Sequence, residues 1–260
     1  MEFSFGDYAD AVTRALARFD HVCAARDYLA LPEPDRRQAR VLFLRHDCER
    51  DLTKALTLAR IEHEKGVSAT YFVRVHSEYY NPLQPPERRI LREIVELGHE
   101  IGLHYEPRFY SDEGLDLLDA IDADRALLAG IPGVGPVSAL SAHQPLLSPP
   151  DFATIAGRGL TEVYIHPEFR AMRYYSDSGM NWREKTLAEA VETESRCQFL
   201  IHPDFWNDTA TDWFSNLDAR RDAVVAELDA TVEAEKRMLR DYLARRDQRD
   251  AEFGKLLGKS

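Results

Sequence analysis

Short apolar runs alternate with amphipathic segments through the middle of the chain, from Val41 to about residue 205. The apolar runs have the length of buried strands, and the segments between them have the length of helices. Gly66 and Gly98 each follow a helical segment, in the position where a glycine ends a helix. About seven such units without an internal repeat predict a parallel α/β fold, either a barrel or an open sheet.

Polar residues at the ends of the predicted strands favour the barrel. In a barrel the carboxyl ends of all strands meet on one face, and active sites lie there. We therefore predict an α/β fold, a distorted (β/α) barrel of about seven strands. The strand-end residues are Asp47, Glu49, Arg74, His76, His104, His143, His166 and His202.

The chain is predicted to have three parts. Residues 1–40 form an N-terminal helical extension, with one or two helices over 6–31, and residues 41–216 form the barrel. Within the barrel, residues 166–185 are predicted to be irregular. Residues 217–260 form a C-terminal helix and tail with one apolar stripe. The stripe is predicted to pack on the outside of the barrel, and an oligomer formed through this helix is the alternative.

Composition limits the partners and the compartment. The formal net charge of −12 argues against a nucleic acid or an anionic membrane as partner. Three widely spaced cysteines are typical of a reducing compartment. No apolar run approaches the roughly 18 residues of a membrane span, and the first residues lack a signal-peptide pattern. We expect a cytoplasmic protein without a membrane span.

The first predicted barrel strand, from Val41, ends in a group of charged residues. Because strand side chains alternate between faces, Arg45, Asp47 and Glu49 share one face. Two carboxylates at the end of a buried strand are costly unless a metal, a substrate or hydrogen-bond donors compensate them. A surface turn in a charge-rich protein is the alternative for this segment alone.

A second segment, Gly98-His99-Glu100-Ile101-Gly102-Leu103-His104, adds a candidate metal ligand. On this strand His104 shares a face with Gly102, which leaves room beside it, whereas His99 points to the other face. A neutral imidazole next to strand-end carboxylates is a plausible ligand for a divalent metal such as zinc.

Together with Thr70-Tyr71-Phe72, these segments resemble the polysaccharide deacetylase superfamily, also called the NodB homology domain or carbohydrate esterase family 4. The resemblance covers roughly residues 41–205. It implies a distorted barrel that removes N-acetyl groups from sugars, using a divalent metal, an aspartate base and a histidine acid. It assigns the acidic pair, one a base and the other a metal ligand, to Asp47 and Glu49, a metal ligand to His104, and the acid to His202. We predict Asp47 as the base, with Glu49 as the alternative.

The sequence departs from the family pattern at Arg108, where the family usually has a second metal-binding histidine. An arginine cannot ligate a metal, so the third ligand must come from elsewhere. His143 is the first substitute and His166 the second. Since Glu49 is longer than the usual aspartate, Asp47 could also bind the metal. The predicted metal is zinc, with cobalt or nickel as alternatives, and the predicted ligands are Asp47, Glu49, His104 and His143.

Substrate contacts are predicted for Arg45 and Arg108, and for Asp177 and Trp182 in the segment 174–183. Aromatic, hydroxyl and acidic groups in that segment suit a sugar, although a turn-rich loop anchored by Trp182 would have the same composition. The predicted function is removal of an N-acetyl group from a sugar or sugar conjugate, with a nucleotide-linked sugar or a surface-polysaccharide pathway as candidates. A hydrolase of a non-sugar C–N bond and a silent carbohydrate-binding barrel are the alternatives.

Overall fold

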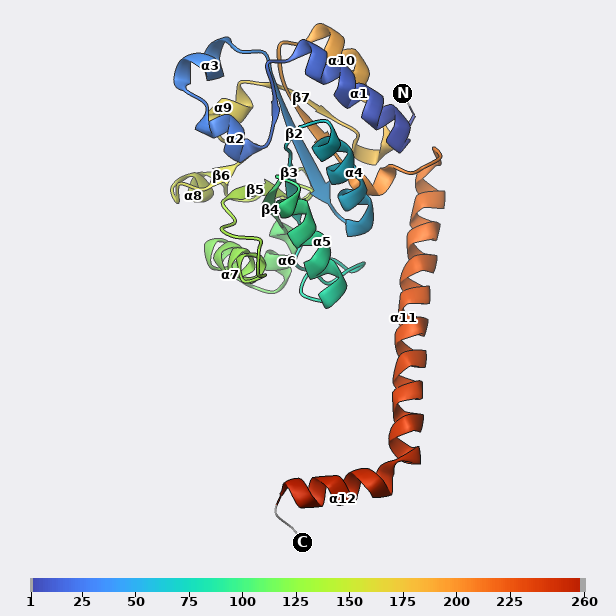
Figure 1. Cartoon of the computed structure of the whole chain (residues 1–260). Coiled ribbons are helices and arrows are strands. Elements are labelled where there is room, and N and C mark those ends of the chain that lie inside the picture. The colour runs from blue at the N-terminus through green and yellow to red at the C-terminus, as the bar shows by residue number, and fades with distance from the viewer. Residues whose placement is uncertain (1, 258–260) are drawn as a thin grey trace. The chain divides into compact units, whose positions relative to one another are not determined.

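One parallel sheet organises the larger part of the chain (Figure 1). The computed structural model describes residues 2–257, and the chain divides into two compact units, Met1–Asn216 and Leu217–Ser260. In the first unit the strand order is β6-β5-β4-β3-β2-β8-β7, with β1 also paired to β2. The sheet curls into a half-barrel, so the predicted distorted (β/α) barrel is confirmed. The strands are β1 (His21–Cys23), β2 (Val41–Cys48), β3 (Thr70–Val73), β4 (Glu100–Tyr105), β5 (Ala139–Ala142), β6 (Thr161–Glu162), β7 (Arg173–Ser176) and β8 (Arg196–Ile201).

Strand β2 lies at the centre of this sheet. It pairs along one edge with β8 and along the other with β1 and then β3, with Val41 opposite His21 and Arg45 opposite Thr70. All eight of its residues are buried. A strand that is covered on both faces needs a continuous apolar run, here Val41 to Leu44. This run makes the segment the clearest strand in the sequence.

The two end strands, β6 and β7, share no backbone pairing among the described residues. Side chains lie between them instead. The rings of Tyr164, just after β6, and Tyr174, in β7, are 6.2 Å apart. The Arg45 guanidinium lies over both rings, at 4.5 Å and 5.9 Å from their centroids. At this edge β6 and β7 are therefore connected by two tyrosines and the arginine that packs against both.

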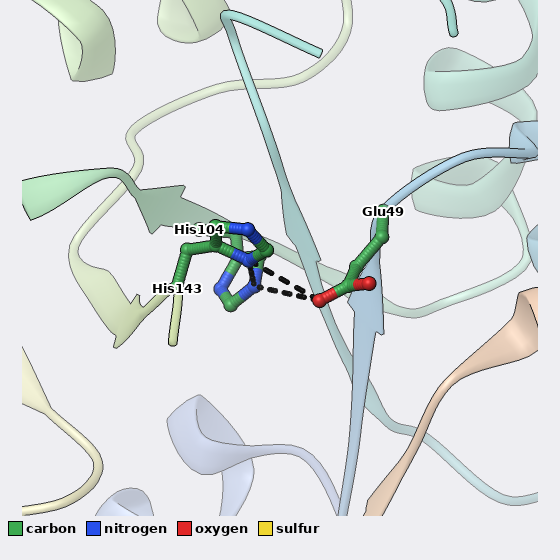
Figure 2. Close-up of side chains that lie close together, drawn as sticks. All are labelled: Glu49, His104 and His143. Carbon is green, nitrogen blue, oxygen red and sulfur yellow. Dashed lines mark hydrogen bonds and ion pairs between the residues drawn. The ribbon is translucent and has the colours of Figure 1, made fainter. Parts of the chain in front are cut away.

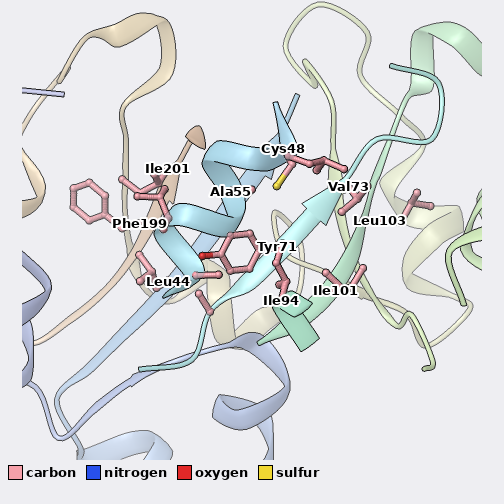
Figure 3. Close-up of a cluster of buried hydrophobic side chains, with 14 of the residues drawn as sticks. Leu44, Cys48, Ala55, Tyr71, Val73, Ile94, Ile101, Leu103, Phe199 and Ile201 are labelled. Carbon is pink, nitrogen blue, oxygen red and sulfur yellow. The ribbon is translucent and has the colours of Figure 1, made fainter. Parts of the chain in front are cut away.

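Helices cover the sheet, and the apolar core lies between them and the strands. Figure 3 shows Ala55 of α4 and Ile94 of α5 packed over Tyr71, Ile101 and neighbouring strand residues. Asp51 caps α4 by accepting from the backbone N–H of Thr53. The helices of the first unit are α1 (Phe5–Arg18), α2 (Ala25–Ala30), α3 (Glu33–Gln38), α4 (Leu52–Glu64), α5 (Pro85–Glu96), α6 (Pro107–Asp112), α7 (Leu117–Ala129), α8 (Phe152–Ala156), α9 (Pro167–Arg170) and α10 (Leu187–Thr193), with short 3-10 turns at Ser178–Met180 and Pro203–Phe205.

A polar cluster lies inside this apolar layer, on the face of β2 opposite to Asp47. Glu62 of α4 is fully buried and accepts hydrogen bonds from the hydroxyls of Tyr8 and Tyr71 and from Nε2 of His46. Nδ1 of His99 is 3.5 Å from the same carboxylate. Burial acts to raise the pKa of Glu62, but the histidines and hydrogen bonds outweigh it, and its pKa lies below the usual value. The ionised Glu62 thus ties α1 and α4 to the sheet.

Two strands were not predicted from the sequence. The one or two helices predicted over 6–31 are present as α1 and α2, but β1 lies between them, and the segment predicted as irregular contains β7. Both strands are short, and each is held by hydrogen bonds to a strand far away in the sequence, β1 to β2 and β7 to β8. Local periodicity carries no information about such long-range pairing.

The second unit holds most of α11 (Trp213–Ala244) and all of α12 (Arg246–Leu256). The long C-terminal helix is confirmed, whereas its use in an oligomer and the boundaries of the three predicted parts stay predictions. Residues 258–260 of the predicted tail lie outside the described residues. None of the described helices is both long enough and apolar enough to cross a membrane.

Candidate metal centre and acid–base residues

Three potential metal ligands from three strands of the sheet, β2, β4 and β5, converge at its carboxyl end (Figure 2). Glu49 follows β2, His104 lies in β4, and His143 follows β5. One ligand atom from each lies within 4.8 Å of the others. Nδ1 of His143 is 3.2 Å from Oε1 of Glu49 and 3.1 Å from Nε2 of His104. The parallel strands bring these residues together because all three strands end at the same edge.

Neighbouring groups orient two of the three candidate ligands, His104 and Glu49. Nδ1 of His104 donates to the backbone carbonyl of Ser141 at 3.0 Å, so Nε2 is the nitrogen left for a metal. The second carboxylate oxygen of Glu49 contacts Arg50 at 2.9 Å. Ligands that are held in this way by a second set of contacts are typical of metal sites.

The protonation states suit a divalent cation. Burial lowers the pKa of His143, which favours the neutral imidazole that a metal requires. Burial acts to raise the pKa of Glu49, but hydrogen bonds from His104 and His143 outweigh it, and its pKa lies well below the usual value. Two imidazoles and one carboxylate are a known zinc ligand set that leaves a position for substrate. The residues present therefore fit the metal that the motifs imply.

Asp47 lies beside this cluster. Its Oδ2 accepts from the Ser141 hydroxyl at 3.1 Å and is 3.5 Å from Nη2 of Arg45 and 3.8 Å from Nδ1 of His104. Its Oδ1 is buried and has no hydrogen-bond partner. A buried carboxylate oxygen without a donor is unfavourable. It is available to a ligand or to a proton.

His202, after β8, forms the second polar group of the site. Its Nδ1 donates to Oδ1 of Asp177 at 2.7 Å, and its backbone N–H and the Trp206 indole N–H donate to the same carboxylate at 3.0 Å. Burial acts to lower the pKa of His202, but the charges of Asp177, Glu49 and Asp47 outweigh it and raise the pKa to about 9. His202 is therefore held as a cation at neutral pH.

The remaining predicted site residues lie in different surroundings. Arg45 and Asp177 are fully buried, whereas Arg108 is exposed. Trp182 stacks on Phe3 with the ring centroids 5.3 Å apart. His166 directly precedes α9 and is not among the converging ligands. Substrate contacts by the first four residues stay predictions.

Sequence reasoning did not identify Ser141 and Asp177 as the residues that contact the candidate acid–base residues Asp47 and His202. Ser141 contacts both Asp47 and His104, and Asp177 holds His202 across 25 residues of sequence. Ser141 lies on the strand that precedes His143, so the register of that strand could have indicated it. Nothing in the Ser-Asp-Ser setting of Asp177 points to a histidine on another strand.

No family model and no curated protein matches the chain. Solved structures with a similar fold include a carbohydrate esterase family 4 pseudoenzyme from Bacillus anthracis, with 13% identity, a TM-score of 0.45, and coverage of 72% of this chain and 61% of that one. The chain thus spans about three fifths of that protein. The peptidoglycan deacetylase PdaC from Bacillus subtilis shows 16% identity, a TM-score of 0.43, and coverage of 80% and 96%.

The chitin deacetylase from Colletotrichum lindemuthianum shows 18% identity, a TM-score of 0.43, and coverage of 70% and 81%. All these TM-scores lie below 0.5, so the description of the fold rests on the strand order given above. The structures found are carbohydrate esterase family 4 proteins, the family that the sequence motifs resemble.

Proposed function

We propose that the chain is a metal-dependent hydrolase that removes an N-acetyl group from a sugar or sugar conjugate. One observation carries this proposal. Glu49, His104 and His143 converge next to a carboxylate with a free oxygen, Asp47, and the carboxylates of this site help to keep His202 charged. Hydrolysis of an acetamide needs these three elements, a metal site, a base and an acid.

In this proposal Oε1 of Glu49, Nε2 of His104 and Nδ1 of His143 would hold a divalent metal, with zinc preferred and cobalt or nickel as alternatives. When bound, the metal supplies Lewis-acid chemistry at the substrate carbonyl. Asp47 and His202 perform the proton transfers.

Asp47 acts as the base. Its free Oδ1 accepts the proton of the attacking water, while the Ser141 hydroxyl and Arg45 hold Oδ2. His202 acts as the acid and donates a proton to the departing amine. The Asp177 carboxylate fixes the ring through Nδ1, which leaves Nε2 as the nitrogen that delivers the proton.

The candidate substrates are those considered above, a nucleotide-linked sugar or a precursor of a surface polysaccharide. A cytoplasmic location is part of the proposal. Three buried cysteines without disulfides support it.

Metal analysis and acetate release test the proposal. Protein purified without chelator should carry close to one zinc per chain, and it should release acetate from at least one member of a panel of N-acetylated sugars. Asp47→Asn should lower kcat by about 10²–10⁴ without removing the metal. Metal-dependent ring opening of a cyclic amide without acetate release would instead identify the alternative hydrolase.

The two candidate third ligands provide a matched pair of variants. His143→Ala should weaken zinc binding at least tenfold in a chelator competition, whereas His166→Ala should leave it unchanged. Loss of zinc from the His166 variant alone would refute the ligand set. A metal-loaded protein that releases no acetate from any substrate would refute the deacetylase.

A further inference from the structure

A cavity of about 570 Å³ opens beside the candidate metal centre, and His143 forms part of its wall. Pockets of this volume accommodate a small ligand such as a sugar. Its lining has three arginines, Arg50, Arg74 and Arg108, three carboxylates, Glu78, Glu106 and Asp112, and the histidines His76 and His143. The whole chain has 45 acidic residues and 33 Lys and Arg residues, so the cavity is less acidic than the protein as a whole.

Two of the arginines, Arg50 and Arg74, form ion pairs with buried carboxylates and have a structural role in the cavity wall. Arg50 contacts Glu49 at 2.9 Å and Asp204 at 3.6 Å. Arg74 donates from Nε to Glu106 at 2.9 Å. Removing a partner from a buried pair is strongly unfavourable, so these arginines are not available to a ligand.

Arg108 is different, because its partner is weakly bound. Its Nε is 3.5 Å from Asp112, one helical turn further on, and the two side chains are 76% and 67% exposed. Such surface pairs contribute little to stability. The guanidinium can therefore leave Asp112 for a ligand at little cost, and its planar N–H groups match a carboxylate or a phosphate.

His76 supplies a second donor. Its Nε2 is 3.0 Å from Oδ2 of Asp124, a buried carboxylate that also accepts from the Tyr110 hydroxyl, and its ring stacks on Phe109 at 4.0 Å. These contacts fix the ring. The hydrogen bond to Asp124 raises the pKa of His76, which favours the charged form. Nδ1 has no partner among the described residues, and in the charged form of the ring it carries a second N–H that can donate to a ligand.

From this geometry we infer that the cavity binds an acidic group, a carboxylate or a phosphate, carried by the N-acetylated sugar, and that Arg108 and His76 recognise it. The inference rests on the proposed function in one respect, namely that the acetamide lies at the metal centre. His143 belongs both to the converging ligands and to the cavity wall, so one substrate can reach both. The substrate class is then an acidic N-acetyl sugar rather than a neutral one.

Calorimetry with the metal-loaded Asp47→Asn protein tests this, because turnover is blocked and binding is read directly. The ligands are N-acetylglucosamine as the neutral reference, its 1-phosphate and 6-phosphate, and N-acetylmuramic acid as the carboxylate. At least one acidic ligand should bind ten times more tightly than the neutral sugar. Whether a phosphate or the carboxylate binds best identifies the group.

Variants of the two recognition residues make the test specific. In the Asp47→Asn background, Arg108→Gln and His76→Gln should each reduce the affinity for the acidic ligand about tenfold and change that for the neutral sugar less than twofold. The matched control is Arg158→Gln, because Arg158 also forms a surface ion pair, with Asp122, and is not part of the cavity lining. It should change neither affinity.

Equal affinity for neutral and acidic ligands, or equal losses for both in the Arg108 variant, would overturn the inference. Because Arg108 is exposed, its variant is expected to fold even if the His76 variant does not. Acetate release is measured separately. Tighter binding of acidic sugars without acetate release would contradict the proposed deacetylase activity but not the acidic-group site. Acetate release without tighter binding of acidic sugars would contradict only the acidic-group site.

Discussion

The pairing of His202 with Asp177 leads to a prediction that can be worked out in detail. The substitution Asp177→Asn removes the carboxylate that accepts from Nδ1 and the backbone N–H of His202 and from the indole of Trp206. An amide has only one acceptor oxygen, so at least one of these donors loses its partner. An unpaired buried donor costs about 1–3 kcal/mol, and the variant should be less stable by about this amount.

The larger expected effect of Asp177→Asn is on the protonation of His202. In the intact site the pKa of His202 is raised to about 9 from 6.5. Without the Asp177 charge, we expect the pKa to fall toward 6.5, because burial lowers it and only the smaller contributions of Glu49 and Asp47 still raise it. The value 6.5 is the limit for a complete loss of the shift. At pH 8 the protonated fraction would then fall from about 0.9 to about 0.03. If His202 is the acid, kcat/KM at pH 8 should fall by up to about thirtyfold, with most activity recovered near pH 6.

Two assays check this prediction. A pH profile of kcat/KM should show an alkaline limb near pH 9 in the unmodified protein and one shifted toward pH 6.5 in the variant. NMR titration of the His202 ring should show the same shift without any need for turnover. The control is Trp206→Phe, which removes one hydrogen bond but keeps the charge and should leave the alkaline limb in place. An unchanged His202 titration in the Asp177 variant would refute the reasoning.

Other predictions concern stability and are measured by chemical denaturation. Glu62→Gln should destabilise the fold by about 3–5 kcal/mol, since a buried ionised partner is lost, whereas Tyr8→Phe should cost only about 1–2 kcal/mol; equal effects would argue against an ionised Glu62. Gly102→Ala should cost about 1–3 kcal/mol, because a Cβ there would lie 2.5 Å from the Phe72 ring; Phe72→Leu in the same protein should recover part of the loss. Burial raises the pKa of Glu162 to about 7 from 4.5, so the folded state holds this proton while the unfolded state has lost it. Stability should therefore fall by about 3 kcal/mol as the pH rises from 4.5 to above 7, and Glu162→Gln should remove this decrease; the same pH dependence in the variant would contradict the assignment.

The barrel and the candidate metal ligands Glu49 and His104 could be predicted because their signals are local. The apolar run of β2 and the alternation of its side chains place Asp47 and Glu49 on one face, and the same alternation separates His104 from His99. His99 indeed lies in the polar cluster on the other face. His143 could be proposed as a ligand because a parallel strand ends just before it.

The other parts of the site depend on contacts between distant segments. Asp177 meets His202 only because β7 pairs with β8, and β7 is a strand of four residues of which only Tyr175 is buried, too short for a clear strand signal. The shared face of Arg45 and Asp47 could be predicted, and their side chains are 3.5 Å apart. The sequence did not indicate that Arg45 also packs against two tyrosines at the edge where β6 and β7 meet. No spacing rule indicates that the end strands of this sheet lie next to each other.

The strands next to the candidate metal ligands differ in how many backbone hydrogen bonds hold them in the sheet, and this difference should affect the rate of metal exchange. Glu49 follows β2, which is paired with other strands along both edges. His143 follows β5, which on its outer edge is paired only with the two-residue strand β6. Amide hydrogens of β2 should exchange with solvent only on global unfolding, while the β5–β6 margin should open more often. A metal bound by both Glu49 and His143 would connect β2, the strand best protected from exchange, to the β5–β6 edge, which opens more often. Its release rate would then be set by local opening at β5, and metal loading should slow hydrogen exchange there more than anywhere else in the sheet.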